Sequence, residues 1–193
     1  MLSVIIATYN NERPLVRTLS ALVSAAATGV VREVIITDGG SSDATRDVAD
    51  IAGCDIADDG GPLAQRLAAA AAKARSDWLM FLRPGAIPDS GWAEEFTQFV
   101  QRMDLQDDSA VNAAAFRRSN LFSPNRSALA EALSMLGAAL FSRVDADQGL
   151  IIAKRHYEAL GGHRATSDTE GDLLRQVGRR LILLRSGAAF TTD

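Results

Sequence analysis

Two polar segments of the sequence carry side chains that could bind a flat, hydrogen-bonding ligand. The first, Thr8–Glu12, follows the apolar run Leu2–Ala7, and the second, Asp38–Asp43, follows another apolar run. A carboxylate such as that of Asp38 can accept a hydrogen bond from a ring N–H, and the ring of Tyr9 can stack on a base. The glycines of the second segment let a ligand approach the backbone closely. Both segments therefore carry residue types that can contact a flat ligand through hydrogen bonds and stacking.

Charged residues further along the chain could act on phosphate groups and protons. The guanidinium groups of Arg66 and Arg83 match the geometry of a phosphate and stay protonated, and Arg66 could equally reach a base. The carboxylates of Glu170 and Asp172, and that of Asp147 before them, can accept a proton from a hydroxyl group. Candidate cations and candidate general bases thus lie far apart in the sequence, and the fold must bring them together.

Apolar, β-branched runs that alternate with segments of helical period must position these residues. The alternation predicts an α/β fold, a three-layer α/β/α arrangement with a mostly parallel central sheet. In such sheets ligands bind beyond the carboxyl ends of the strands, which here are Thr8–Glu12, Asp38–Asp43, Arg83–Ala86 and the region around Asp147. The expected strands are Leu2–Ala7, Glu33–Thr37, Asp55–Ala57, Trp78–Leu82, Val111–Phe116, Gly149–Ala153 and Leu181–Leu184. The expected helices are Arg13–Ala27, a segment that ends near Ile51 and is capped by Ser42 or Asp43, Leu63–Arg75, Gly91–Met103, Ser127–Phe141, a short helix that ends at Leu160, and Thr169–Val177.

Two segments stand at the ends of the first two expected strands: residues 3–12 (Ser-Val-Ile-Ile-Ala-Thr-Tyr-Asn-Asn-Glu) and residues 33–45 (Glu-Val-Ile-Ile-Thr-Asp-Gly-Gly-Ser-Ser-Asp-Ala-Thr). In this order and at this separation, they resemble the nucleotide-binding half of family 2 glycosyltransferases of the GT-A fold. Gln65-Arg66 matches the place where that family carries an Arg, and Ser76–Leu82 looks like the strand that leads to its metal motif. Asp147–Gly162 is similar to the acceptor-side segment of a bacterial subgroup. The resemblance therefore covers nearly the whole chain.

The resemblance implies one GT-A domain over residues 1–193, with a nucleotide-donor half in 1–110 and an acceptor-side half in 111–193. On the acceptor side it implies roles for Asp147 and Gln148. An alternative for Asp38 is a capping role in an ordinary strand–loop–helix turn. Asn10 and Arg66, taken singly, could also be structural. The nucleotide-binding residues that the resemblance implies are Ala7, Thr8, Tyr9, Asn10, Glu12, Asp38, Gly39 and Arg66.

One segment departs from the family. Its members usually carry an Asp-x-Asp-like motif whose carboxylates hold Mg²⁺ or Mn²⁺ at the donor diphosphate, but Arg83 and Gly85 occupy those positions here. We therefore expect no metal ligands at this place. In one interpretation Arg83 supplies the positive charge itself. In the other the site has decayed, in line with Leu67 and Ala69, which replace an Asn and a Gly expected after Arg66. A third possibility is that Arg83 is a surface residue.

The family's catalytic base comes from a Glu-Asp pair at the start of a late helix. In Ser-Asp-Thr-Glu-Gly-Asp-Leu-Leu-Arg (residues 167–175), Glu170 matches the first acid, and Asp172 takes the second place if one residue is deleted. Both are candidate catalytic bases, with Asp147 as a further candidate. Alternatively, Asp168, Glu170 and Asp172 cap a helix and complement its dipole.

Composition excludes several classes of protein. The formal net charge of −4 argues against a general nucleic-acid binder, and the single cysteine, Cys54, rules out a thiolate metal cluster. Residues 1–110 carry a net charge of −7 and residues 111–193 one of +3, with 18 Arg among the 20 cations of the chain. This second half could meet phosphates or an anionic membrane surface, or its Arg residues could lie on solvated helix faces.

The apolar runs are too short for a transmembrane helix, and Met1 is followed by no basic leader. The sequence therefore favours the cytoplasm, with a place at the surface of the inner membrane if the basic half meets lipid.

The resemblance implies a bacterial glycosyltransferase that transfers a sugar from a nucleotide donor, UDP-linked, to an acceptor hydroxyl with inversion, without a metal if Arg83 replaces it. The acceptors of such proteins are often lipid-linked or cell-envelope polysaccharide. The alternative is a non-catalytic GT-A protein that acts as a nucleotide-binding or regulatory module. The chain stops soon after its last expected strand, and we interpret it as a near-minimal GT-A core.

Overall fold

The computed structural model describes residues 1–57, 60–106, 113–119 and 144–191. The strands are β1 (Leu2–Thr8), β2 (Val31–Asp38), β3 (Asp55–Ala57), β4 (Trp78–Leu82), β5 (Ala86–Pro88), β6 (Ala113–Arg118), β7 (Leu150–Ala153) and β8 (Leu181–Phe190). The helices are α1 (Glu12–Ala27), α2 (Thr45–Ile51), α3 (Leu63–Lys73), α4 (Trp92–Gln106), α6 (Lys154–Ala159) and α7 (Thr169–Val177), with short 3₁₀ turns η1 (Ala146–Gln148) and η2 (Gly178–Arg180).

The strands form one sheet in the order β3-β2-β1-β4-β7-β6-β8-β5. Strand β1 pairs in parallel with β2 on one side and β4 on the other, and β3 extends the parallel part. Strand β7 runs antiparallel to both β4 and β6, and β6 pairs in parallel with β8. Because the chain leaves β1 for β2 and later returns on the other side to β4, a crevice is expected at the carboxyl ends of these three strands. The amino end of β7 reaches the same edge.

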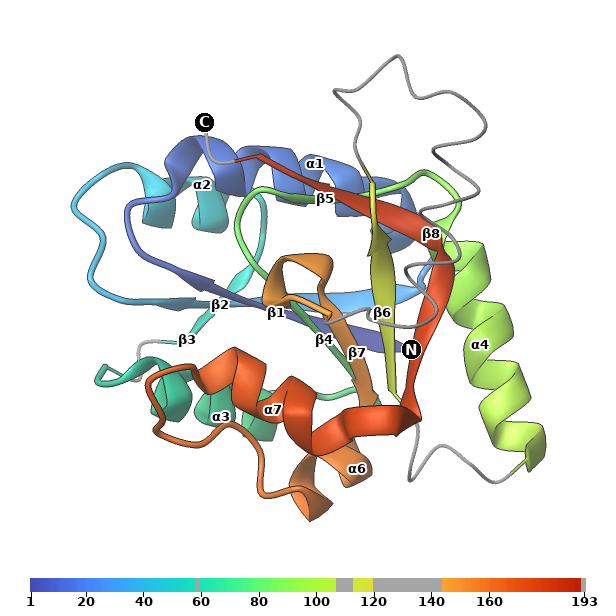
Figure 1. The fold of residues 1–193 in the computed structure, drawn as a ribbon. Helices are drawn as coiled ribbons and strands as arrows, with labels where there is room; N and C mark the ends of the chain where they lie inside the picture. Colours follow the sequence, from blue (N-terminus) through green and yellow to red (C-terminus); the bar gives the residue numbers. More distant parts are fainter. Residues whose placement is uncertain (58–59, 107–112, 120–143, 192–193) are drawn as a thin grey trace, which may run out of the picture.

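Two hydrophobic clusters, one on each face of the sheet, explain the three layers. On one face, the side chains of α1, α2 and α4 pack against alternate residues of β1 and β4 such as Val4 and Met80. On the other face, α3, α6 and α7 cover the intervening residues such as Ile5 and Leu79 (Figure 1). Strands buried on both faces read as continuous apolar runs, as β1 and β4 do.

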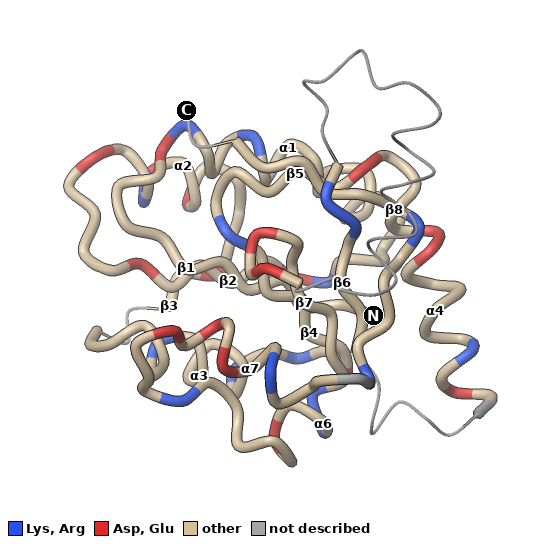
Figure 2. Tube along the Cα trace, viewed as in Figure 1, with Lys and Arg blue, Asp and Glu red and all other residues tan. Residues whose placement is uncertain are grey.

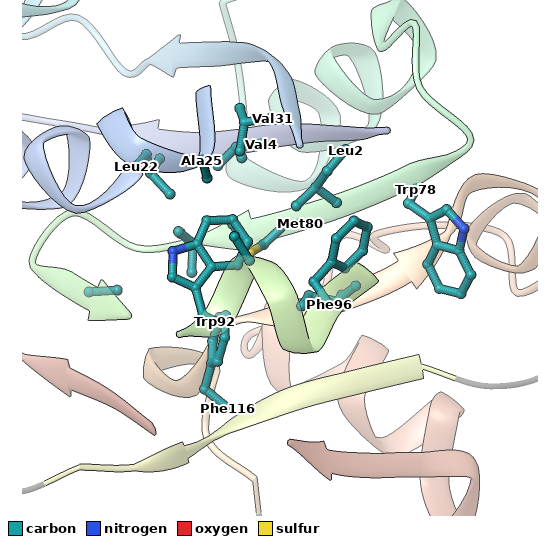
Figure 3. Packing of buried hydrophobic residues seen from close by; sticks show 14 of the residues in the cluster. Leu2, Val4, Leu22, Ala25, Val31, Trp78, Met80, Trp92, Phe96 and Phe116 are labelled. Carbon is teal, nitrogen blue, oxygen red and sulfur yellow. The ribbon is translucent and has the colours of Figure 1, made fainter. Parts of the chain in front are cut away.

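Aromatic side chains fill the first of these clusters at the α4 end. Figure 3 shows Trp92 and Phe96 of α4 directed at the sheet beside Met80. The rings of Trp92 and Phe116 meet edge to face with centroids 6.1 Å apart. Trp78 makes similar contacts with Phe96 and Phe99. This packing holds α4 against β4 and β6.

The predicted fold class is confirmed, and the differences lie at particular elements. The bounds of β4 and α7 agree with the sequence prediction, and α3 ends at Lys73 rather than Arg75. Strand β8 is longer than predicted and pairs through its last residues with β5, a strand that the sequence pattern does not reveal. The segment Ser127–Phe141, expected as a helix, lies outside the described residues.

Candidate functional site

Asp38, the last residue of β2, joins the two loops that follow β1 and β2. Its Oδ1 accepts hydrogen bonds from the hydroxyl groups of Thr8 (2.9 Å) and Ser41 (2.5 Å). Its Oδ2 accepts the backbone N–H groups of Gly40 (3.0 Å) and Ser41 (2.8 Å). The side chain of Asp38 has no exposed surface. Its carboxylate therefore serves first to hold the loop in place.

The pKa of Asp38 agrees with its role in holding the loop. Burial alone would raise the pKa of Asp38, but the hydrogen bonds from Ser41, Thr8 and Gly40 outweigh it and keep the pKa below its usual value. A carboxylate has about four acceptor sites, and these donors use them. Direct recognition of a base N–H by Asp38 would require it to give up one of these hydrogen bonds. The carboxylate braces its own loop and does not cap α2, whose N-cap residue is Ala44.

A second set of hydrogen bonds ties the loop after β1 to the start of α2. Asn10, which has a positive φ of 51°, accepts at Oδ1 the N–H of Ser42 over 2.8 Å. The N–H of Asn11 donates to the hydroxyl of Thr45, and Asp43 accepts N–H groups from both Glu12 and Thr45. Sequence reasoning missed Asn11 and Thr45 because nothing in the pattern says which loop residues meet across the gap between two strands.

Tyr9, Gly39 and Arg66 lie together on the open side of these loops. The ring of Tyr9 is 62% exposed, whereas Arg66 is 8% exposed and donates from Nη1 to the carbonyl of Thr37 over 2.7 Å. A Cβ on Gly39 would lie 3.2 Å from Nη2 of Arg66 and 3.4 Å from Cδ2 of Tyr9. The Nε of Arg66 is buried without a hydrogen-bond partner among the described residues. A stackable ring, a bare backbone position and a buried guanidinium thus adjoin one another.

Arg83 follows β4 and brings two distant carboxylates together. Its Nε and Nη2 donate to Oε2 of Glu170 on α7, over 2.9 and 2.5 Å. Its Nη1 donates to Oδ1 of Asp147 on η1, over 2.8 Å. The hydrogen bond with Glu170, together with the nearby negative charges, raises the pKa of Arg83 above its ordinary value, so the guanidinium keeps its charge. The side chains are partly exposed, 41% for Arg83, 22% for Glu170 and 24% for Asp147.

The other predicted site residues occupy different places. Asp172 turns to its own helix, where it accepts a hydrogen bond from Gln176 and lies 3.6 Å from Arg175. Gln148 is buried and donates to the carbonyl of Phe116, so its side chain braces η1. Ala7 pairs within the sheet with Thr37. Glu12 begins α1, where its N–H donates to Asp43.

Among the described residues, carboxylates outnumber cations around Arg83. Figure 2 shows acidic stretches at the start of α7 and on the turn before β7. Arg118 lies 3.4 Å from Asp145 and 4.0 Å from Asp147, and Arg175 lies 2.8 Å from Asp168. A pocket of about 540 Å³ opens beside this cluster, with Leu174 and Leu181 among its apolar residues and Arg83, Asp147, Asp168 and Arg175 among its charged ones. The pocket is thus amphipathic and rich in acids.

The residues present do not fit the divalent cation that the fold family usually carries after β4. The guanidinium of Arg83 already bridges Asp147 and Glu170. Gly85 has a φ of 97°, and a Cβ there would lie 2.0 Å from the carbonyl oxygen of Thr191, so no carboxylate fits at this position without movement of the chain. Among the described residues, no group of three or more His, Cys, Asp or Glu side chains is placed to hold a metal ion. We therefore derive no step through a metal.

Within the described parts of the chain, no helix is both long enough and apolar enough to span a bilayer.

Solved structures share this fold. TarS 1–349 from S. aureus superimposes with a TM-score of 0.72 at 14% identity, with 98% of this chain and 60% of that chain covered. Glucosyl-3-phosphoglycerate synthase from Mycobacterium tuberculosis, in complex with Mn²⁺, UDP and glucosyl-3-phosphoglycerate, superimposes with a TM-score of 0.67 at 16% identity, over 100% of this chain and 72% of that one. TarS 1–349 has also been solved with UDP-GlcNAc (TM-score 0.64, 14% identity, 100% and 59% covered). At these identities the likeness establishes the fold.

Sequence comparison gives the family. No curated protein matches the chain. The model of the glycosyl transferase family 2 matches residues 3–145, which include β1 to β6 and the positions of Asp38, Arg66 and Arg83. The chain therefore belongs to glycosyl transferase family 2.

Proposed function

We propose that this protein transfers a sugar from a nucleotide-sugar donor to an acceptor hydroxyl group. The observation that carries the proposal is the convergence, in a chain of this family, of the loops after β1, β2 and β4 at one edge of the sheet. UDP as the nucleotide is supported by the structures of TarS and of glucosyl-3-phosphoglycerate synthase, which hold UDP or UDP-GlcNAc. The chain spans 60% of TarS 1–349, so the activity is proposed for this chain and not carried over.

The nucleoside would lie against Tyr9, Gly39 and Arg66. The exposed ring of Tyr9 offers a stacking surface, and the absence of a side chain at Gly39 lets the base approach the backbone. The guanidinium of Arg66 adjoins Gly39 through Nη2, which would be the donor to a carbonyl group of the base. Asp38 would act mainly by fixing the loop on which Gly39 lies.

The diphosphate would lie against Arg83, without a divalent cation. A guanidinium binds phosphate oxygens through two parallel N–H groups and carries a permanent charge, so it can stabilise the negative charge that develops on the leaving diphosphate. Arg83 stands at the carboxyl end of β4, next to the loops of the nucleoside site, and its side chain is partly exposed.

Glu170 is better placed than Asp172 to act as the base. It contacts Arg83 at the sheet edge, whereas Asp172 contacts Gln176 and Arg175 on its own helix. In an inverting transfer the acceptor oxygen attacks the anomeric carbon opposite the leaving diphosphate, and a carboxylate takes the hydroxyl proton as the new bond forms. The acceptor would enter from the pocket beside Asp147, and we propose a lipid-linked or polysaccharide hydroxyl as the acceptor.

A second candidate function is that of a non-catalytic nucleotide-binding module. It is favoured by the ion pairs of Arg83 with both Asp147 and Glu170, which leave fewer donors for a diphosphate.

Turnover with a panel of UDP-, GDP- and CDP-sugars distinguishes the two candidates. With Mg²⁺ and Mn²⁺ both supplied and release of the nucleoside diphosphate measured, a transferase is expected to turn over at least one donor, and its Glu170→Gln variant to lose that activity. Tight UDP binding without turnover of any donor, with or without a mixture of glycolipid and polysaccharide acceptors, would favour the non-catalytic module. Absence of binding by every nucleotide would refute both.

A further inference from the structure

Arg83 and Glu170 are assigned opposite tasks, yet they are bound to each other. The side-on edge of the guanidinium, formed by Nε and Nη2, donates both hydrogen bonds to one oxygen of Glu170. That edge can hold a phosphate through two N–H groups, and the other such edge includes Nη1, which donates to Asp147. The hydrogen bonds from Nε and Nη2 both reach Oε2 of Glu170, which leaves Oε1 able to accept a proton but holds the side chain against Arg83. In the arrangement of the structure the phosphate-binding edge of Arg83 is therefore occupied, and the candidate base is held beside it instead of being free to follow an acceptor hydroxyl.

The two carboxylates that hold Arg83 differ in how firmly they are fixed. Asp147 lies on η1, which is closed by a capping box between Asp145 and Gln148 and is anchored by the hydrogen bond from Gln148 to Phe116. Glu170 lies in the first turn of α7, and the described structure gives its carboxylate hydrogen bonds from Arg83 only. Its side chain can change rotamer while Asp168 continues to cap the helix.

The net charge around Arg83 disfavours a diphosphate while both carboxylates are in place. Arg83 with Asp147 and Glu170 carries a net charge of −1, so a diphosphate that arrived with both carboxylates in place would add to an excess of negative charge. Departure of Glu170 removes one carboxylate from the guanidinium and frees the edge that faces it. Removal of Asp147 instead would leave the guanidinium without its fixed partner.

We propose that the donor diphosphate takes the Nε–Nη2 edge of Arg83 from Glu170 while Asp147 keeps the guanidinium in position, so that the base is released only when the donor is bound. This inference rests on the proposed function and deepens it. Arg83 binds the diphosphate and, before the donor arrives, holds the side chain of the base, whereas Asp147 is a positioning residue. The donor therefore binds before the acceptor is deprotonated.

Nucleotide binding by two variants of equal charge tests the proposal. UDP, inorganic pyrophosphate and uridine are titrated calorimetrically in EDTA into the wild-type protein and into Glu170→Gln and Asp147→Asn. Both variants remove one negative charge beside Arg83. Glu170→Gln is expected to bind UDP about tenfold more tightly, the size of one charge-assisted hydrogen bond, because the competitor is weakened. Asp147→Asn is expected to bind UDP more weakly, because the guanidinium loses its fixed partner.

Asp172→Asn is the matched control for charge on α7, since it removes a carboxylate from the same helix that does not contact Arg83. It is expected to change UDP affinity by less than about twofold. Uridine, which lacks phosphate, should bind all four proteins alike. Thermal unfolding of each variant checks that the fold is retained, and Glu170→Ala serves as a second test if Glu170→Gln is unstable.

The proposal is overturned if Glu170→Gln binds UDP no more tightly than Asp172→Asn does, if both variants beside Arg83 shift affinity in the same direction, or if uridine shows the same changes as UDP. Failure of both UDP and pyrophosphate to bind Glu170→Gln also overturns it. These outcomes are separate from failure of the proposed function, which would appear as tight, correctly shifted UDP binding without turnover of any donor sugar.

Discussion

The loops after β1 and β2 are joined by hydrogen bonds from hydroxyl and backbone N–H groups to a carboxylate without exposed surface, whereas Arg83, Asp147 and Glu170 are joined by partly exposed ion pairs. The first arrangement is costly to open, because each buried donor left unpaired loses a hydrogen bond that water does not replace. The second is cheap to rearrange, because partly exposed ion pairs contribute little to stability. We infer that the nucleoside loops are preorganised and that the Arg83 cluster is the part that changes during the reaction.

The largest effect is expected from Arg83→Ala. Because Arg83 is the proposed stabiliser of the leaving diphosphate, its removal should lower kcat by about 10²–10³-fold, as does loss of a preorganised donor in other active sites. The free energy of unfolding should fall by less than about 1 kcal/mol, because its ion pairs are partly exposed. Kinetics of donor turnover and urea unfolding measure the two effects. A large loss of stability would show that Arg83 is structural.

Asp38→Ala should give the opposite pattern. Loss of the carboxylate leaves the donors of Thr8, Gly40 and Ser41 unsatisfied, and we expect the free energy of unfolding to fall by about 2–3 kcal/mol. Asp147→Ala, at a partly exposed ion pair, is the comparison, with an expected loss below about 1 kcal/mol. Equal losses in the two variants, measured by urea unfolding, would erase the proposed difference between the regions.

Tyr9→Ala should weaken UDP binding without affecting stability. The ring is 62% exposed, so its loss costs little in folding, whereas stacking of a base on an aromatic ring contributes about 1–3 kcal/mol. We therefore expect UDP affinity to fall about tenfold and pyrophosphate affinity to stay unchanged, by calorimetry. If pyrophosphate binding fell as well, Tyr9 would belong with the diphosphate rather than the nucleoside.

The smallest expected effect is on how the free energy of unfolding depends on pH in acid. Because folding lowers the pKa of Asp38, the unfolded chain binds a proton at this carboxylate more readily than the folded chain does. The stability that the carboxylate contributes is therefore present above its unfolded pKa of about 3.9. It is lost as the pH falls through the lower pKa of the folded state. Below about pH 4, wild-type stability should thus fall by up to about 1.4 kcal/mol per pH unit more than that of Asp38→Asn. Parallel curves for the two proteins, followed by chemical unfolding from pH 5 to pH 2.5, would contradict the lowered pKa.

The sequence predicts elements whose apolar pattern is local and misses those that depend on distant partners. The run Trp78–Leu82 is uniformly buried, and its bounds follow from the pattern alone. Strand β8 was expected to end at Leu184, because Arg185, Ser186 and Gly187 interrupt the apolar run. In the structure Glu95 accepts hydrogen bonds from the N–H groups of Arg185 and Ser186, which lets the strand continue.

The same distinction applies to the site. That the polar ends of β1, β2 and β4 share one edge follows from the parallel order of an α/β sheet. Tertiary contacts that no local pattern encodes decide how these residues pair. Asp38 accepts a hydrogen bond from Thr8, 30 positions away, and Arg83 donates to Glu170, 87 positions away. The sequence therefore located the candidate residues, whereas their pairing required the structure.

We propose that Arg83 provides, beside the donor diphosphate, the positive charge that a divalent cation would otherwise supply. The most direct test is donor-sugar turnover by the wild-type protein in excess EDTA, compared with turnover after addition of Mg²⁺ or Mn²⁺. Equal rates are expected in both conditions, together with loss of turnover in Arg83→Ala that added metal does not restore. Turnover that EDTA abolishes and Mn²⁺ restores would contradict it.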